Sequence, residues 1–253
     1  MNPDRYLRSF DVLDLLAQHK EGLRLTGIKD ALGLPVSSVH NMLQTMVSAE
    51  VAAVSESLRY TIGPRAVSMA LRTLRSLDIR TTARRHLEDL VKDIGDDVYL
   101  AMRVGKRVFY ADRVYGTQRI SLDIRLGGSL SLHCTATGKL FAAFDAKLAA
   151  QTLAGRLPRV TPSTITDPHE LEREYKAIRT AGFSRSAGEA VEGIVGYAVP
   201  IQDGSGKLTA AIHVSVLSKR ATKAHERTLL AAAHACAEQI ARHMGNTGTG
   251  ARA

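Results

Sequence analysis

Apolar residues near the start of the chain recur every three or four positions in three short segments, the spacing of amphipathic helices. These segments are residues 6–18, 26–32 and 36–48. Thr26 is a candidate N-cap for the second helix, and Gly33 supplies the break before the third. On the first helix the expected apolar side is formed by Leu7, Phe10, Leu13, Leu16 and Ala17.

A small hairpin follows the third helix, with strands expected over 51–55 and 59–63 and a connection at 56–58. Three helices followed by such a hairpin are typical of a winged helix-turn-helix, in which the last helix enters the major groove of DNA. We therefore assign residues 1–64 to a DNA-binding domain of this class.

The third helix has one apolar and one polar face. Its apolar stripe repeats at i, i+3, i+4 and i+7 and consists of Val39, Met42, Leu43 and Met46. The opposite face is polar and uncharged, and an ordinary solvated helix would show the same face. The complete unit of three helices and a wing favours DNA, with Asn41 and Gln44 suited to an adenine edge. The candidate DNA contacts are Ser37, Ser38, His40, Asn41, Gln44, Thr45 and, at the wing tip, Arg59.

After Pro64 the pattern predicts a helical linker over 65–80 and then a second, larger domain over 81–245. Strands and helices are mixed in this domain, so its class is α+β. Residues 246–253 are expected to form a disordered tail. Strands are expected over 98–104, 107–114, 193–201 and 208–216, and helices over 135–144, 170–180 and 223–244.

The net charge of +9 does not by itself indicate a DNA-binding surface. The first 64 residues hold six Lys or Arg against seven Asp or Glu, a net charge of −1. Residues 65–85 hold six Arg against one Asp, a net charge of +5, so the basic cluster follows the predicted DNA-binding domain. Within that cluster Arg72, Arg75, Arg84 and Arg85 are alternative candidates for phosphate contacts.

Several other classes of protein are excluded by the sequence. No apolar run approaches the roughly 20 residues that span a bilayer, and the N-terminus does not read as a secretory signal, so a cytoplasmic protein is expected. The histidines and the two cysteines show no metal-ligand spacing, and no cofactor is expected. Cys134 next to His133 is the one candidate nucleophile. Neighbours on a strand point to opposite faces, so a buried structural cysteine is favoured.

Several long motifs resemble the IclR family of prokaryotic regulators. GLPVSSVHNMLQTM (33–46), followed by RYTIGPRAVSMA (59–70), is similar to its DNA-binding half. SLHCTATGKLFAAF (131–144) and the stretch 182–216 are similar to its two sensor-domain signatures. The resemblance implies a GAF-like effector domain and a homodimer or tetramer on double-stranded operator DNA. It also implies control by a small metabolite, often an organic or aromatic acid, and leaves repression and activation equally open. The alternative is an enzyme of GAF-like fold that uses Cys134 for redox or hydrolytic chemistry.

The chain departs from the family pattern at several positions. The DNA-binding half has Lys29 for a small residue, Val36 and Asn41 where Lys and Arg are common, and Glu50 for a glycine before the wing. In the sensor domain Gly196 replaces a frequent cysteine. His213 replaces the first of two serines on the last strand, and Ser215 remains.

These departures predict a pocket that differs from those holding very small keto acids. The residues expected to converge on it are Ala136, Thr137, Gly138, Ser186, Glu189, Gly196, His213 and Ser215. We expect a ligand larger than a three-carbon acid, with its carboxylate at the helix start at 136–138. His213, which can donate a hydrogen bond in either protonation state, would bind a second polar group. The other interpretation of His213 is a satisfied, half-buried histidine on a strand.

Overall fold

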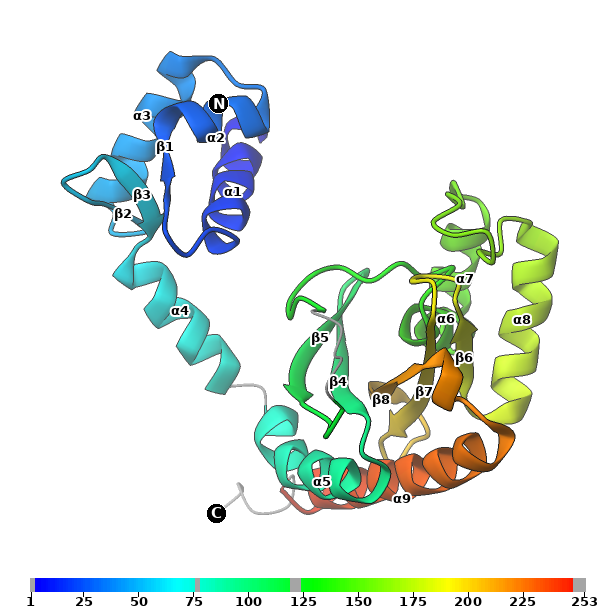
Figure 1. The fold of residues 1–253 in the computed structure, drawn as a ribbon. Helices are drawn as coiled ribbons and strands as arrows, with labels where there is room; N and C mark the ends of the chain where they lie inside the picture. Colours follow the sequence, from blue (N-terminus) through cyan, green and yellow to red (C-terminus); the bar gives the residue numbers. More distant parts are fainter. Residues whose placement is uncertain (1–2, 76–77, 119–123, 248–253) are drawn as a thin grey trace. The chain divides into compact units, whose positions relative to one another are not determined.

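The computed structural model describes residues 3–75, 78–118 and 124–247 (Figure 1). The contacts within the chain divide it into two compact units, 1–77 and 78–253. The predicted boundaries at residues 64, 80 and 245 are finer than this division and stay predictions.

The first unit contains the three predicted helices and the predicted hairpin. Its elements are α1 (Pro3–Ala17), β1 (Leu23–Arg24), α2 (Leu25–Leu32), α3 (Val36–Ser48), β2 (Ala52–Val54), β3 (Arg59–Ile62) and α4 (Pro64–Arg75). The three strands form an antiparallel sheet in the order β1-β3-β2. The apolar stripe of α3 packs on Val12 and Leu16 of α1 and Ile28 of α2, so the helix-turn-helix prediction is confirmed.

Two local predictions in this unit are wrong. Thr26 does not cap α2, because the helix already begins at Leu25 and the extended Arg24 precedes it without a side-chain cap. Leu7 and Phe10 are not core residues of this chain, since they are 64% and 63% exposed. Leu16 of the predicted stripe is buried and Leu13 is partly buried against the same core, with Val12 beside them, so the stripe is correct at Leu13 and Leu16 only.

Glu50 adopts a left-handed backbone with a φ of 58° at the turn between α3 and β2. Glycine adopts this conformation at no steric cost, whereas a side chain adds strain of about 1–2 kcal/mol. The turn geometry therefore gives a physical reason for the glycine expected at this position.

The second unit is built on a five-stranded antiparallel sheet, which confirms the α+β prediction. Its helices are α5 (Asp78–Ile94), α6 (Ala136–Ala143), α7 (Ala146–Leu153), α8 (Pro168–Ala181) and α9 (Lys223–Thr247). Its strands are β4 (Asp97–Val104), β5 (Arg107–Val114), β6 (Ser184–Ala187), β7 (Ile194–Gln202) and β8 (Leu208–Leu217), in the order β5-β4-β8-β7-β6. A 3-10 turn, η1 (Ser218–Arg220), links β8 to α9.

Helices cover both faces of this sheet (Figure 1). α5 and α9 pack against each other and against β4 and β7, while α6 packs with α8 over the opposite face.

α9 extends to Thr247, so the expected disordered tail starts inside a helix. Residues 248–253 lie outside the described part. The short β6 and α7 were not predicted.

A β-bulge in β5 places the side chains of Tyr110 and Asp112 on opposite faces of the sheet. Leu100 pairs with Asp112 and Ala101 with Tyr110, so Ala111 is the extra residue. Tyr110 consequently packs in the core beneath α6, while Asp112 bonds to residues of α5 on the other side. In a regular strand these two residues would share one face.

Candidate functional site

The polar face of α3 is accessible, as a DNA-reading helix requires. Ser37, His40, Asn41, Gln44 and Thr45 are exposed, and Ser38 is half-buried. The Thr45 hydroxyl donates to the Asn41 carbonyl at 2.9 Å, which occupies its proton within the helix. Gly33 has the expected left-handed φ of 62° at the turn before α3. The individual base and phosphate contacts stay predictions.

Arg59 is not at the wing tip. It opens β3 opposite Arg24, and its Nη1 donates to the Gly22 carbonyl at 2.9 Å. The tip consists of residues 56–58, of which Leu58 is exposed with a φ of 57°. Arg59 thus braces the small sheet, and a phosphate contact by this side chain stays a prediction.

Part of the basic stretch after α4 is already paired inside the second unit. Arg84 donates to Asp112 at 3.1 Å and to the Arg113 carbonyl at 2.9 Å, and it also pairs with Glu88. Arg80 lies 3.6 Å from the same Asp112 carboxylate. These two guanidinium groups pair α5 with the edge strand β5. Their charges are therefore largely balanced by Asp112 and Glu88 rather than available for phosphate contacts.

The second unit contains a cavity of about 140 Å³ between β5, the start of α6, and strands β6, β7 and β8. Five of the eight predicted effector residues line it: Ala136, Ser186, Gly196, His213 and Ser215. The other lining side chains are mainly apolar, and sequence reasoning missed them. They are Tyr110, Ile124, Leu130, Ala190, Val191 and Ile194, with Thr135 as an additional polar member.

The remaining three predicted residues support the cavity wall from behind. Thr137 is fully buried, and its hydroxyl lies 3.2 Å from the Tyr110 hydroxyl. A Cβ at Gly138 would lie 2.0 Å from the Ser131 carbonyl oxygen, so only glycine lets the helix approach this turn. The Gly138 N–H is not free for a ligand either, since it donates to the Thr135 hydroxyl at 3.0 Å.

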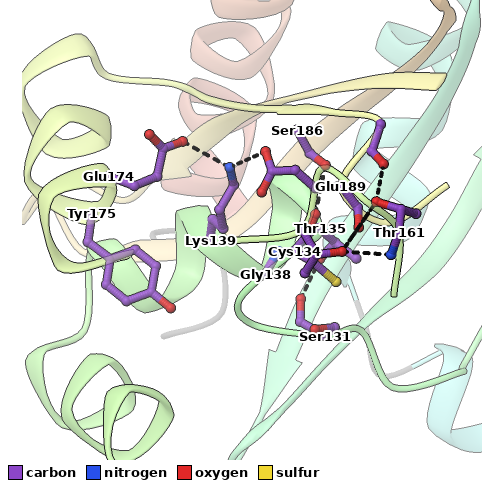
Figure 2. Close-up of polar contacts among 12 residues, drawn as sticks. Ser131, Cys134, Thr135, Gly138, Lys139, Thr161, Glu174, Tyr175, Ser186 and Glu189 are labelled. Atoms are coloured by element: carbon purple, nitrogen blue, oxygen red, sulfur yellow. Dashed lines mark hydrogen bonds and ion pairs between the residues drawn. The ribbon is translucent and has the colours of Figure 1, made fainter. Parts of the chain in front are cut away.

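Glu189 belongs to a buried ion cluster around Lys139. Lys139 is fully buried, and its Nζ lies 2.7 Å from Glu189 and 2.9 Å from Glu174 of α8 (Figure 2). The hydroxyls of Thr161 and Thr164 donate to the Glu189 carbonyl and fix the same loop. Burial raises the pKa of the Glu189 carboxyl, and the Lys139 ammonium opposes the shift. The glycine and lysine of the 131–144 motif therefore organise the cavity wall.

His213 is a buried polar side chain in the cavity wall. It is buried against the rings of Tyr99 and Tyr110, at centroid distances of 5.6 and 5.1 Å. Its Nδ1 has no hydrogen-bond partner among the described residues. Burial lowers the pKa of His213 to about 3, so the imidazole is neutral at physiological pH. His213 is thus buried rather than half-buried, and its Nδ1 is not satisfied within the described residues, which does not fit the interpretation of a satisfied, half-buried histidine. The other interpretation, a ligand donor in the cavity, stays a prediction, because a neutral imidazole still carries one N–H donor.

Gly196 and His213 lie close together, and the space for the imidazole depends on the absence of a side chain at residue 196. They lie on the neighbouring strands β7 and β8, and a Cβ at residue 196 would lie 2.8 Å from His213 Cε1. It would also lie 3.4 Å from the Ala136 Cβ, so a side chain at residue 196 would be crowded from two sides unless its neighbours shift. The two departures of the sensor domain from the family pattern are thus sterically linked.

Cys134 is not placed as a nucleophile. Residues 132–134 form a turn rather than the expected strand. Both ring nitrogens of His133 are occupied, Nδ1 at 2.8 Å from the Ser131 hydroxyl and Nε2 at 2.9 Å from the Pro158 carbonyl. Burial raises the pKa of the Cys134 thiol, which disfavours the reactive thiolate.

Two further properties concern the described residues as a whole. None of their helices has the length and apolar character to cross a bilayer. Among the same residues, no three His, Cys, Asp or Glu side chains gather as a metal site.

Comparison with known proteins accounts for most of the chain. Residues 7–52 match the IclR helix-turn-helix domain, and residues 71–242 match the family described as bacterial transcriptional regulator IclR C-terminal. The curated relative SauR of Cupriavidus necator, named a probable transcriptional regulator, is 32% identical over 221 residues, covering 85% of this chain and 87% of that protein.

Solved structures give the same result. The crystal structure of the Thermotoga maritima IclR is 28% identical, with a TM-score of 0.76 over 96% of this chain and 100% of that one. An IclR homologue of Microbacterium hydrocarbonoxydans, crystallised in complex with 4-hydroxybenzoate, is 25% identical, with a TM-score of 0.80 over 94% and 99%. The curated relatives are regulators, so the alternative of an enzyme built on Cys134 is not supported. The chain belongs to the IclR family of bacterial transcriptional regulators.

Proposed function

We propose that the cavity of the second unit binds a single-ring organic acid and that this acid controls operator binding by the first unit. The observation that carries the proposal is the unpartnered Nδ1 of His213, buried in the wall of an otherwise mainly apolar cavity. A buried polar atom without a partner is costly, and a ligand that bonds to it removes that cost.

The size of the cavity fits one aromatic ring. Its volume of about 140 Å³ compares with roughly 150 Å³ for an engineered apolar cavity that binds benzene. The Microbacterium hydrocarbonoxydans homologue was crystallised with 4-hydroxybenzoate, which is also a single-ring acid. This supports an aromatic acid over an acid of two or three carbons.

The carboxylate of such a ligand fits the start of α6. The N–H groups of Ala136 and Thr137 lie in the first turn, where a helix offers no internal acceptor. These groups and the positive end of the helix dipole favour an anion. His213, being neutral, would bond to the second polar group of the ligand at the opposite wall.

The effector would act through α4 and α5, which connect the two units in sequence. Half-sites on DNA lie about one helical turn apart or a multiple of it, so the spacing of two DNA-binding domains decides occupancy. A ligand shifts that spacing only by its different affinity for the two arrangements. The regulated genes and the direction of control, repression or activation, are not specified by these contacts.

We further propose a homodimer that forms through the first unit and pairs into tetramers through the second. Exposed large apolar side chains gather on two helices of the first unit, Leu7 and Phe10 on α1 and Val67, Met69 and Leu71 on α4. Association of two copies would cover such surfaces. This assembly would act on double-stranded DNA in the cytoplasm. Light scattering that shows a monomer at micromolar concentration would contradict it.

The effector proposal is tested by calorimetric titration with benzoate, 4-hydroxybenzoate and aliphatic acids of two to four carbons. His213→Ala and Ser215→Ala should each weaken binding of the aromatic acid by about 1–3 kcal/mol if they donate or accept a hydrogen bond. His169→Ala, on an exposed part of α8, is the matched control and should leave binding unchanged. Binding that ignores both cavity substitutions would place the effector elsewhere.

A further inference from the structure

Val36 is an apolar residue on the exposed face of α3, whose other residues are polar. It is the first residue of α3, is 53% exposed, and follows the extended Pro35. Val36 and His40 are one helical turn apart, so they share the N-terminal end of the exposed face with Ser37 and Asn41. In helix-turn-helix proteins this end of the recognition helix contacts the base edges.

The exposed face of α3 contains no charged residue. Across Val36–Ser48 there is no Arg or Lys, the usual partners of guanine, and no Asp or Glu, which accept from cytosine. The carboxamides of Asn41 and Gln44 belong to exposed residues, and a carboxamide pairs bidentately with adenine. An apolar side chain is the complement of the thymine 5-methyl group.

We infer that α3 reads an A·T-rich half-site in which Val36 packs on a thymine methyl group while Asn41 and Gln44 pair with adenine. This inference rests on the proposed insertion of α3 into the major groove. Val36 is then a specificity-determining residue, because A·T and G·C pairs differ at this position by a methyl group that only thymine carries. Ser37 and His40 are further side chains on this face that can donate a hydrogen bond to guanine, so G·C pairs are expected to be a minority beneath the N-terminal half of the helix.

The energetic expectation follows from the size of one methyl group. Burial of one methyl-sized group contributes a factor of about four in affinity, which corresponds to about 0.8 kcal/mol at 1.4 kcal/mol per ten-fold. This factor should disappear when either the methyl group or the valine side chain is removed. The loss of both together should equal the loss of either one.

The experiment starts with selection of bound duplexes from a random pool by the full-length protein. A·T pairs should dominate the enriched half-sites. Each thymine of the selected site is then replaced by deoxyuridine, which removes the 5-methyl group and keeps the base pair. For the wild-type chain one such replacement per half-site should weaken binding about four-fold, and for Val36→Ala the same replacement should have no effect.

Val160→Ala is the matched control, because Val160 is also 53% exposed but lies in the second unit. This variant should keep the full deoxyuridine effect. Half-sites rich in G·C pairs, or a deoxyuridine effect that persists in Val36→Ala, would overturn the inference while leaving the DNA-binding role of α3 in place. If no sequence is enriched, or if Asn41→Ala and Gln44→Ala leave the selected sequence unchanged, the proposed role of α3 itself fails.

Discussion

The buried imidazole of His213 predicts a specific loss of stability in acid. Its pKa falls from 6.5 in the unfolded chain to about 3 in the folded one, because burial penalises the charged form. A depressed pKa means that the unfolded state binds the proton more readily. The contribution of His213 to stability is therefore complete above pH 6.5 and is lost as the pH falls toward 3.

The size of this effect follows from the shift. One pKa unit corresponds to 1.36 kcal/mol, so the interval from pH 6.5 to pH 4 removes about 3 kcal/mol from the free energy of unfolding. This is a large part of the total for a typical domain, roughly 5–15 kcal/mol. His213→Gln cannot take up the proton, so the variant should lose about 3 kcal/mol less than the wild type over the same interval.

The assay is denaturant unfolding of the full chain at a series of pH values from 7 to 4. Near-UV circular dichroism of tyrosine reports on the second unit, because the fully buried tyrosines, Tyr99, Tyr175 and Tyr197, all lie there. The difference between wild type and variant isolates His213, since the other titrating groups are common to both. Parallel pH dependence of the two proteins would show that the imidazole is hydrated or charged in the folded state, and the argument for a neutral ligand donor would fall with it.

Three further substitutions test the packing described above by denaturant unfolding. Gly196→Ala should cost about 1–3 kcal/mol by overpacking, and most of that cost should vanish in a His213→Ala background. An equal cost in both backgrounds would show that the ring is not the obstacle. Lys139→Met leaves the Glu189 carboxylate buried without its cation and should cost about 3–5 kcal/mol, while adding Glu189→Gln should restore part of it. Failure of that rescue would place the stabilisation outside this pair. Glu50→Gly should stabilise the first unit by up to about 1 kcal/mol. The glycine relieves the left-handed backbone strain, and this gain is partly offset because it raises the conformational entropy of the unfolded chain. A loss of stability would show that the backbone at residue 50 is not strained.

The predictable parts of the fold are those whose sequence pattern is long. The stripe of α3 spans four buried residues, so its helix was predicted with the bounds that the structure shows. β1 has two residues, too few for a period of two to emerge. β6 consists of Ser184, Arg185, Ser186 and Ala187, none of which is a typical strand residue. α1 failed in a different way. Leu13 and Leu16 of the predicted stripe pack on the core, but Leu7 and Phe10 of the same stripe are exposed, so periodicity alone did not show where the buried part of the helix begins.

The candidate site was predictable where a motif fixes the backbone, and part of the missed wall is supplied by loops, whereas Tyr110 and Ile194 were missed on strands. Residues 136, 186, 196, 213 and 215 lie on regular elements named by the motifs, and the structure brings them together. Ile124, Leu130 and Val191 come from connections whose apolar residues have no periodicity to identify them. The role of Lys139 was hidden as well, because its partners lie 35 and 50 residues further along the chain.

The close approach of Gly196 to His213 also constrains the order in which this pocket arose. A side chain at position 196 would crowd the imidazole at 213, so a histidine accepted before the glycine would have carried a packing cost of about 1–3 kcal/mol. The route with the glycine first avoids that cost, because a chain with glycine at 196 and a small residue at 213 would have held an enlarged cavity. The same geometry has a practical side. A histidine introduced at the position of residue 213 should meet the same crowding in any chain that keeps a side chain at the position of Gly196, so transfer of this pocket calls for changes on two neighbouring strands.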